Sequence, residues 1–216
     1  MNRHVSPIKD ASSKIKPMTR RAVAKQHTRR RILAAARRLF SELGYERATI
    51  RDIASAAGMS TGAVFANFSD KADLFREIMI EDMGKLAAQM SEAAAQGGDV
   101  EEVLVRIFEA GYTFYQDRLP LARAAFSVGW SLDDGEALRT QPATGVLREI
   151  FRDALFAGFT SGELPPDPEF ELRARMLYDG YLSNYIEAVY GASDLQSLMD
   201  TARGQIRILL AGARRG

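Results

Sequence analysis

The 216-residue sequence contains no cysteine, only two histidines and a single tryptophan. The absence of cysteine excludes disulfide bonds, thiol nucleophiles and cysteine-ligated metal sites. The longest stretch without a charged residue, 53–69, is interrupted by Ser, Thr, Asn and Gly, so it cannot form a membrane span. The N-terminus also lacks the apolar segment of a secretion signal. We therefore expect a cytoplasmic protein with no membrane association.

Catalytic chemistry has little support in the sequence. His4 and His27 both lie in or beside a basic N-terminal segment, and no metal-ligand spacing, glycine-rich phosphate loop or Ser–His pairing occurs. Acidic residues such as Glu101 and Asp133 fall at expected helix starts or turns, where capping and solvation explain them. We expect no enzymatic activity, no metal and no cofactor, and an all-helical enzyme remains an alternative.

Charge is abundant but unevenly distributed. The apolar fraction of 46% and the charged fraction of 26% are typical of a folded globular protein. The net charge of +1 conceals a value of +10 for residues 1–76 and −9 for residues 77–216. A polyanion would therefore be attracted to the N-terminal part alone.

Most of the basic excess precedes residue 32, where ten Lys and Arg residues accompany a single acid, Asp10. The same segment contains Pro7 and Pro17 and has no helical period before about residue 19. This composition predicts a flexible basic arm over residues 1–27, with a solvated tail that has no partner as the alternative.

The remaining N-terminal residues are predicted to form short helices. Thr28 can cap a helix over 29–43, in which apolar residues recur at steps of three and four before Gly44. Capping residues then begin further helices at Thr49, Ser60 and Ser69; these helices span 50–57, 61 to about 68, and a segment from residue 70 onward.

The second and third of these helices have the spacing of a helix-turn-helix. They are separated by about three residues that include Gly58, which can adopt a positive φ. Small residues at the start of the third helix would let it enter a major groove, where Thr61 can meet phosphates or base edges and Ala63 a thymine methyl. Asn67 could pair with adenine or with a phosphate. A plain helical hairpin is the alternative.

Lys71 supports the nucleic-acid interpretation. It is expected in the first turn of the fourth helix, where the helix macrodipole disfavours a cation. A bound phosphate would resolve this conflict, because the same helix end offers backbone N–H donors. A lysine that simply extends along the surface is the alternative.

Residues 28 to about 76 resemble the DNA-binding domain of the TetR family of bacterial transcriptional regulators. The segment that carries the resemblance is RRRILAAARRLFSELGYERATIRDIASAAGMSTGAVFANFSDKADLF, residues 29–75. The family usually has Tyr and often His where this chain has Phe65 and Asn67. The resemblance implies that the residues contacting DNA are among Arg29, Arg30, Arg31, Thr49, Arg51, Ser60, Thr61, Gly62, Ala63, Phe65, Asn67 and Lys71.

The resemblance further implies a homodimeric, sequence-specific transcriptional regulator. Such a protein would be a repressor that a small-molecule effector releases from a palindromic DNA operator. A nonspecific or architectural DNA-binding protein is the alternative.

Beyond residue 76 the pattern stays helical. Helices are expected over 74–96, 100–116, 120 to about 133, 142–158, 168–190 and 194–211, and no segment shows strand alternation. The prediction is an all-α fold with an N-terminal three-helix DNA-binding domain (28–76) and a C-terminal helical domain (77–216) for effector binding and dimerisation.

Aromatic residues recur on the C-terminal helices. Stripes at helical spacing are usually core, but the resemblance implies that small effectors bind in this region. The candidate effector-binding residues are Phe108, Tyr112, Phe126, Trp130, Phe151, Tyr178 and Tyr181.

The last two expected helices, 168–190 and 194–211, have long apolar faces, including Leu172 and Ile206. Two such helices from each subunit would form a four-helix dimer interface, in which Gly180 permits close approach. Alternatively, both faces close the subunit's own core.

Overall fold

The computed structural model describes residues 19–116, 119–131, 142–191 and 194–213, and every element in these ranges is a helix. The prediction of an all-α fold is confirmed. The helices are α1 (Arg20–Leu43), α2 (Ile50–Ala56), α3 (Thr61–Phe65), α4 (Lys71–Ala94), α5 (Val100–Gln116), α6 (Leu119–Ser131), α8 (Pro142–Thr160), α9 (Phe170–Tyr190) and α10 (Leu195–Ala213). None of these helices is both long and apolar enough to cross a membrane.

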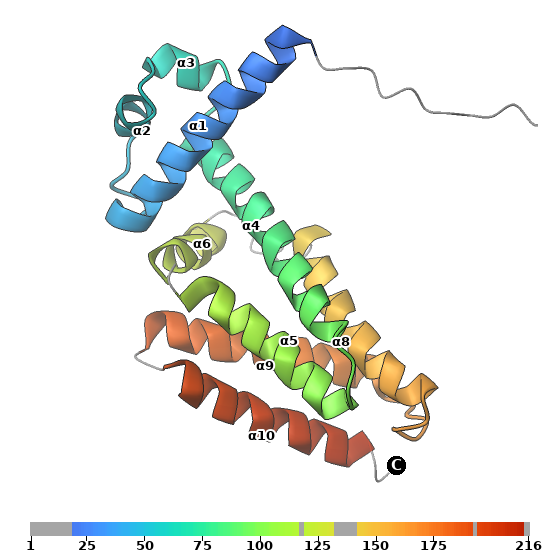
Figure 1. Cartoon of the computed structure of the whole chain (residues 1–216). Helices are drawn as coiled ribbons and strands as arrows, with labels where there is room; N and C mark the ends of the chain where they lie inside the picture. Colours follow the sequence, from blue (N-terminus) through green and yellow to red (C-terminus); the bar gives the residue numbers. More distant parts are fainter. Residues whose placement is uncertain (1–18, 117–118, 132–141, 192–193, 214–216) are drawn as a thin grey trace, which may run out of the picture.

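The helices form two groups that are joined by α4 (Figure 1). Helices α1, α2 and α3 lie at one end of the molecule, and α5, α9 and α10 are layered at the other. α4 runs from the first group into the second, where α8 lies alongside it, and α6 lies below α1 at the junction.

Each group encloses its own hydrophobic core. The N-terminal core comprises buried side chains of α1, α2, α3 and the first turns of α4, together with Leu121 and Ala124 of α6. The C-terminal core contains buried side chains from the later turns of α4 and from α5, α6, α8, α9 and α10. The predicted domain boundary at residue 76 falls inside α4, and Ile78 still packs in the N-terminal core.

Helix α1 begins nine residues before its predicted start at residue 29. Its N-cap is Thr19, whose hydroxyl accepts a hydrogen bond from the backbone N–H of Ala22 (3.3 Å), so Thr28 is not the cap. Residues 20–27 are therefore helical, although their composition predicted a flexible arm; residues 1–18 lie outside the described ranges. All eight residues are exposed, so they have no apolar period that could have revealed the helix.

The other helix boundaries differ less from prediction. α3 ends at Phe65 rather than near residue 68, because the chain tightens into a turn in which the N–H of Asn67 donates to the carbonyl of Val64 (2.9 Å). The N-cap of α4 is Asp70 rather than Ser69. The Asp70 carboxylate accepts from the N–H of Asp73 at 2.7 Å. The expected turn near residue 133 lies outside the described residues.

The Tyr181 side chain of α9 packs directly against α5 at Gly111. A Cβ atom at this position would lie 2.6 Å from the ring of Tyr181, well inside contact distance. Glycine is therefore required for the Tyr181 ring to pack against α5, whereas a Cβ atom added at Gly84 of α4 would have no neighbouring atom within 4 Å.

We predict opposite effects for alanine at these two glycines. Gly111→Ala should lower the free energy of unfolding by about 1–3 kcal/mol through overpacking against Tyr181. Gly84→Ala should raise it by about 0.5–1 kcal/mol, because alanine favours an exposed helix interior. Urea denaturation followed by circular dichroism measures both. Equal stability of Gly111→Ala and the wild type would contradict the close contact between Tyr181 and Gly111.

Candidate nucleic-acid interface

Local capping interactions build the helix-turn-helix as the sequence predicted. The Thr49 hydroxyl accepts from the N–H of Asp52 (3.2 Å), and the Asp52 carboxylate accepts from the N–H of Thr49 (3.3 Å), which completes a capping box. Gly58 has a φ of +63° in the following turn. The Ser60 hydroxyl then accepts from the N–H of Ala63 (3.2 Å) and begins α3.

Aspartate carboxylates accept hydrogen bonds at the N-termini of α2 and α4. The hydrogen bond from the Thr49 hydroxyl lowers the pKa of Asp52, and the backbone N–H of Ser69 lowers the pKa of Asp73 in the first turn of α4. Both carboxylates are therefore held ionised at helix N-termini, where negative charge is favourable.

Several of the predicted DNA-contacting residues lie on the surface. Val64 is fully buried and anchors α3 to the N-terminal core, which leaves the opposite side of this helix exposed. Phe65 is 56% exposed, an unusual position for a phenylalanine. The other exposed members of the set, apart from those already described as caps, are Arg30, Arg31, Arg51, Thr61 and Gly62.

Two of the predicted arginines also hold the helix-turn-helix together. Arg29 donates to the carbonyl of Asn67 (2.7 Å) and pairs with Glu77 of α4 (2.7 Å), while its guanidinium lies 4.1 Å from the ring centre of Phe68. Arg31 donates to the carbonyl of Ala57 at the end of α2 (2.7 Å). These contacts give Arg29 and Arg31 a structural role that the sequence pattern did not indicate.

Lys71 is similarly engaged within the protein. Its ammonium group donates to the carbonyls of Tyr45 (2.9 Å) and Glu46 (3.3 Å) and lies 4.2 Å from the centre of the Tyr45 ring. These acceptors stabilise a cation in the first turn of α4 without a phosphate, so the unfavourable macrodipole alone does not require one. The residues involved are 25 or more positions apart in the sequence, and no local signal indicates the contact.

The amide of Asn67 faces the end of α3. Its Nδ2 donates to the carbonyl of Ala63 (2.9 Å), and its Oδ1 is buried without a hydrogen-bond partner among the described residues. The Asn67 side chain therefore caps the end of α3, which is a structural role rather than the contact with an adenine or a phosphate that the sequence suggested.

The predicted effector residues come together, but as packed core. Tyr112 of α5 stacks on Tyr181 of α9, with ring centres 5.1 Å apart, and Phe108 contacts both rings edge-on. Phe151 lies 5.3 Å from Phe108 and 6.2 Å from Tyr178. We call these five residues the aromatic cluster. Phe126 packs nearby against the ring of Tyr185 (5.7 Å), and the side chain of Trp130 lies outside the described part of the structure.

Buried polar groups border this cluster. The Tyr112 hydroxyl donates to the carbonyl of Tyr181 (3.4 Å) and accepts from Asn184 (3.2 Å), and burial raises the pKa of Tyr112. Asn184 in turn exchanges hydrogen bonds with Gln205 of α10 (2.8 and 3.1 Å). This network links α5, α9 and α10.

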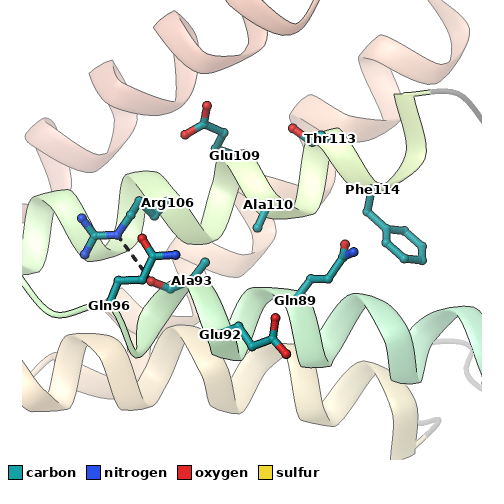
Figure 2. Close-up of a pocket in the computed structure, with 9 residues that line it drawn as sticks. All are labelled: Gln89, Glu92, Ala93, Gln96, Arg106, Glu109, Ala110, Thr113 and Phe114. Carbon is teal, nitrogen blue, oxygen red and sulfur yellow. Dashed lines mark hydrogen bonds between the residues drawn. The ribbon is translucent and has the colours of Figure 1, made fainter.

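An open groove of about 750 Å³ lies elsewhere, between α4 and α5 (Figure 2). Its lining is largely polar and includes Glu92 of α4 and Glu109 of α5, and Arg106 donates from one side to the carbonyl of Ala93 (3.4 Å). None of the seven predicted effector residues lines this groove; its remaining lining residues are Gln89, Gln96, Ala110, Thr113 and Phe114.

The apolar faces of α9 and α10 divide between core and surface. Leu177, Val189 and Ile206 are buried in the subunit's own core, as the alternative interpretation holds. Three other positions support a further interface, because Leu172, Met176 and Ile208 are 51%, 48% and 74% exposed. Gly180 of α9 lies beside Gln205 of α10.

Comparisons with known proteins agree with this architecture. The family model for "Bacterial regulatory proteins, tetR family" matches residues 32–78. The chain is 30% identical over 193 residues to the HTH-type transcriptional repressor AcnR of Corynebacterium glutamicum, covering 84% of this chain and 93% of that protein.

Two solved structures share the fold. The TetR family regulator PfmR from Thermus thermophilus has a TM-score of 0.63 and 25% identity, with 84% of this chain and 97% of PfmR covered. FadR from Bacillus subtilis, solved in complex with stearoyl-CoA, has a TM-score of 0.70 and 18% identity, with 85% and 98% covered. AcnR and the matched family are regulators rather than enzymes, so the expectation that the chain is not an enzyme is confirmed.

We predict that alanine substitutions at Asn67 and Phe65 differ in their effect on folding stability, although both weaken DNA binding. Asn67→Ala should lower the free energy of unfolding by about 1 kcal/mol through loss of the cap, and should weaken binding to all duplexes alike. Phe65→Ala should change stability by less than about 0.5 kcal/mol while also weakening DNA binding. Urea denaturation and binding to a panel of duplexes test this. An Asn67→Ala protein of unchanged stability that loses preference at one symmetric pair of base pairs would show that Asn67 reads a base.

Proposed function

The chain belongs to the TetR family and is a DNA-binding transcriptional regulator, and we propose that it is a cytoplasmic homodimeric repressor released from a palindromic operator by a small molecule. The observation that carries this proposal is the exposed face of α3, held by caps and buried anchors beside a strongly basic N-terminal region. The repressor relative AcnR supports the sign of regulation.

The DNA-contacting surface consists of α3 and its neighbours. Thr61, Gly62 and Ala63 begin α3, and their small size lets its backbone approach base edges closely. Phe65 supplies an apolar contact, and Arg51 of α2 and Arg30 of α1 meet flanking phosphates. Thr49, Ser60, Asn67 and Lys71 contribute mainly by positioning these groups, as do Arg29 and Arg31, which hold the carbonyls of Asn67 and Ala57.

The exposed first turns of α1 add sequence-independent affinity. Residues 20–27 carry Arg20, Arg21 and Lys25 with no acidic residue, and they project at the end of the molecule that bears α3 (Figure 1). Basic side chains on such a segment neutralise phosphates and release counterions, so they strengthen binding to any duplex in a salt-dependent manner.

The dimer forms through the exposed apolar side chains of α9 and α10, Leu172, Met176 and Ile208, which we call the α9–α10 face. Gly180 and Gln205, where the two helices of one subunit meet, are half-buried. Exposed apolar side chains favour helix packing across a twofold axis. A dimer presents two copies of α3 to successive major grooves, roughly 34 Å apart.

Selection from random duplexes tests the function. We expect the wild-type protein to recover one inverted-repeat sequence. Ile208→Asp places a charge in the α9–α10 face, so it should produce monomers in sedimentation velocity and weaken binding to the selected repeat by at least about tenfold, since one half-site alone remains. The matched control Val146→Asp, at a 49% exposed valine of α8, should leave both unchanged.

Two outcomes would contradict the proposal. Recovery of unrelated sequences by the wild type would favour a nonspecific or architectural DNA-binding protein. A dimeric Ile208→Asp protein would exclude the α9–α10 face as the interface.

We propose the aromatic cluster as the effector site. FadR shares this fold and was solved in complex with stearoyl-CoA, which supports the proposal that this chain also binds a small molecule. The rings supply apolar area, while Tyr112 and Asn184 offer buried polar groups that can orient a ligand. Because the rings contact one another, a ligand must displace them to enter.

An effector must show reciprocal coupling with DNA. We expect a thermal-shift screen of apolar and aromatic compounds to identify a ligand that lowers operator affinity by roughly 5–150-fold, with the operator lowering ligand affinity by the same factor. Phe151→Leu in the aromatic cluster should change ligand affinity, and Glu109→Gln in the α4–α5 groove should not. The reverse pattern would move the site to the groove, and a ligand bound equally well with and without operator is not the effector.

A further inference from the structure

One face of α4 places an aspartate between two hydrophobic cores. Ile78, Asp82 and Leu86 are four residues apart and so lie along the same side of the helix. Ile78 is buried in the N-terminal core and Leu86 in the C-terminal core. Asp82 has an exposed fraction of 0% and is the one fully buried charged residue in the described part of the chain.

Asp82 is held from α1. Nη1 of Arg37 donates to Oδ1 of Asp82, and Nη2 of the same guanidinium donates to Glu81 at 3.2 Å. Asp82 Oδ2 is buried and has no hydrogen-bond partner among the described residues, so the carboxylate is only half satisfied. An ionised group in this state is costly to bury.

A contribution to folding stability does not by itself explain why a buried aspartate, paired with Arg37, occupies position 82. A leucine at position 82 would continue the buried stripe and join the two cores, and buried ion pairs are often no more stabilising than apolar groups of similar size. The pair differs from an apolar contact in being directional. Apolar side chains tolerate small rotations, whereas a charge-assisted hydrogen bond requires one distance and one orientation.

The geometry of the guanidinium strengthens this constraint. Arg37 uses a planar, rigid group to contact two successive residues of α4, and their side chains point about 100° apart around the helix axis. Contacts in two directions fix the rotation of α4 about its own axis as well as its distance from α1. Solvent reaches the pair only from the Arg37 side, where the side chain is 24% exposed.

We propose that Arg37 and Asp82 are positioning residues that set the angle between α1 and α4. α1 packs on α2, and α2 packs on α3. The pair therefore sets where the DNA-contacting surface lies relative to the C-terminal helices. In the dimer it thereby sets the separation of the two copies of α3. The consequence for DNA spacing rests on the proposed function, but the effect on interhelix geometry does not.

Because the sequence has no native cysteine, the distance between the N-terminal and C-terminal helices can be measured directly with spin labels attached to introduced cysteines. The substitutions Ser55→Cys on α2 and Ser197→Cys on α10, both at exposed positions, provide the two sites for spin labels in the full chain. Double electron–electron resonance on doubly labelled chains, diluted with unlabelled protein, gives the distribution of distances between the two spin labels within one subunit. We expect a single narrow distribution for the otherwise wild-type protein.

Three variants separate positioning from folding. Asp82→Asn removes the charge pair and should broaden or shift the distribution. Glu42→Gln is the matched control, because Glu42 pairs with Arg38 of the same helix α1 and both side chains are exposed (53% and 57%). The double variant Arg37→Leu with Asp82→Leu leaves no unpaired buried charge. It should regain thermal stability relative to Asp82→Asn but retain the broadened distribution.

A second readout uses DNA. With operators whose half-site spacing changes by single base pairs, we expect the double variant to lose on the order of tenfold in affinity at the preferred spacing and to discriminate less between spacings. Glu42→Gln should keep the wild-type preference. Loss of folding alone would reduce the active fraction without changing the preferred spacing.

The two hypotheses fail differently. A folded double variant with the wild-type distance distribution would overturn the positioning role, whatever its DNA binding. A wild-type protein that selects no operator would instead contradict the proposed function, while the distance measurement would still decide the role of the pair.

Discussion

The continuity of α4 through both hydrophobic cores is the constraint on which the rest of the structure depends. Phe75 and Ile78 belong to one core, and Leu86 and Met90 belong to the other. A helix of 24 residues is about 36 Å long and does not bend easily. A displacement of α4 in one core therefore reaches the other as a rigid-body movement, because no flexible linker between the cores can absorb it. α6 reinforces the connection, since its side chains enter both cores and Arg123 donates to the carbonyl of Val189 near the end of α9 (2.7 Å).

Some basic residues of the N-terminal region hold the fold together, and others are exposed and attract a polyanion. Arg29, Arg31 and Lys71 donate to backbone carbonyls and join segments that are distant in sequence. Arg51 and the first turns of α1 are exposed and contribute most directly to the electrostatic attraction of a polyanion. Net charge alone therefore overstates the number of cationic side chains that face DNA. All the basic residues of this region nevertheless strengthen the positive potential around the DNA-contacting surface.

Local chemistry explains why some features could be predicted from sequence. Thr49, Gly58 and Ser60 have conformational effects within a few residues, so the helix-turn-helix was recognisable without tertiary information. The partners of Lys71 and Asp82 lie 25 to 45 residues away, and no local pattern encodes them. The first turns of α1 escaped prediction for the opposite reason, since a helix with no buried face leaves no hydrophobic period. Helical spacing also showed that the aromatic residues share faces, but it could not show that these rings fill the space between the helices themselves.

The interlocked rings of the aromatic cluster have a kinetic consequence. A ligand that must separate the stacked pair Tyr112–Tyr181 can bind only to the fraction of molecules in which the rings are apart. Its apparent dissociation constant exceeds the intrinsic one by the inverse of that fraction. If ring separation precedes binding, the observed association rate reaches a plateau at high ligand concentration, and the height of this plateau is the opening rate of the core. On this plateau, the response time would be a property of aromatic packing and would no longer depend on the ligand concentration.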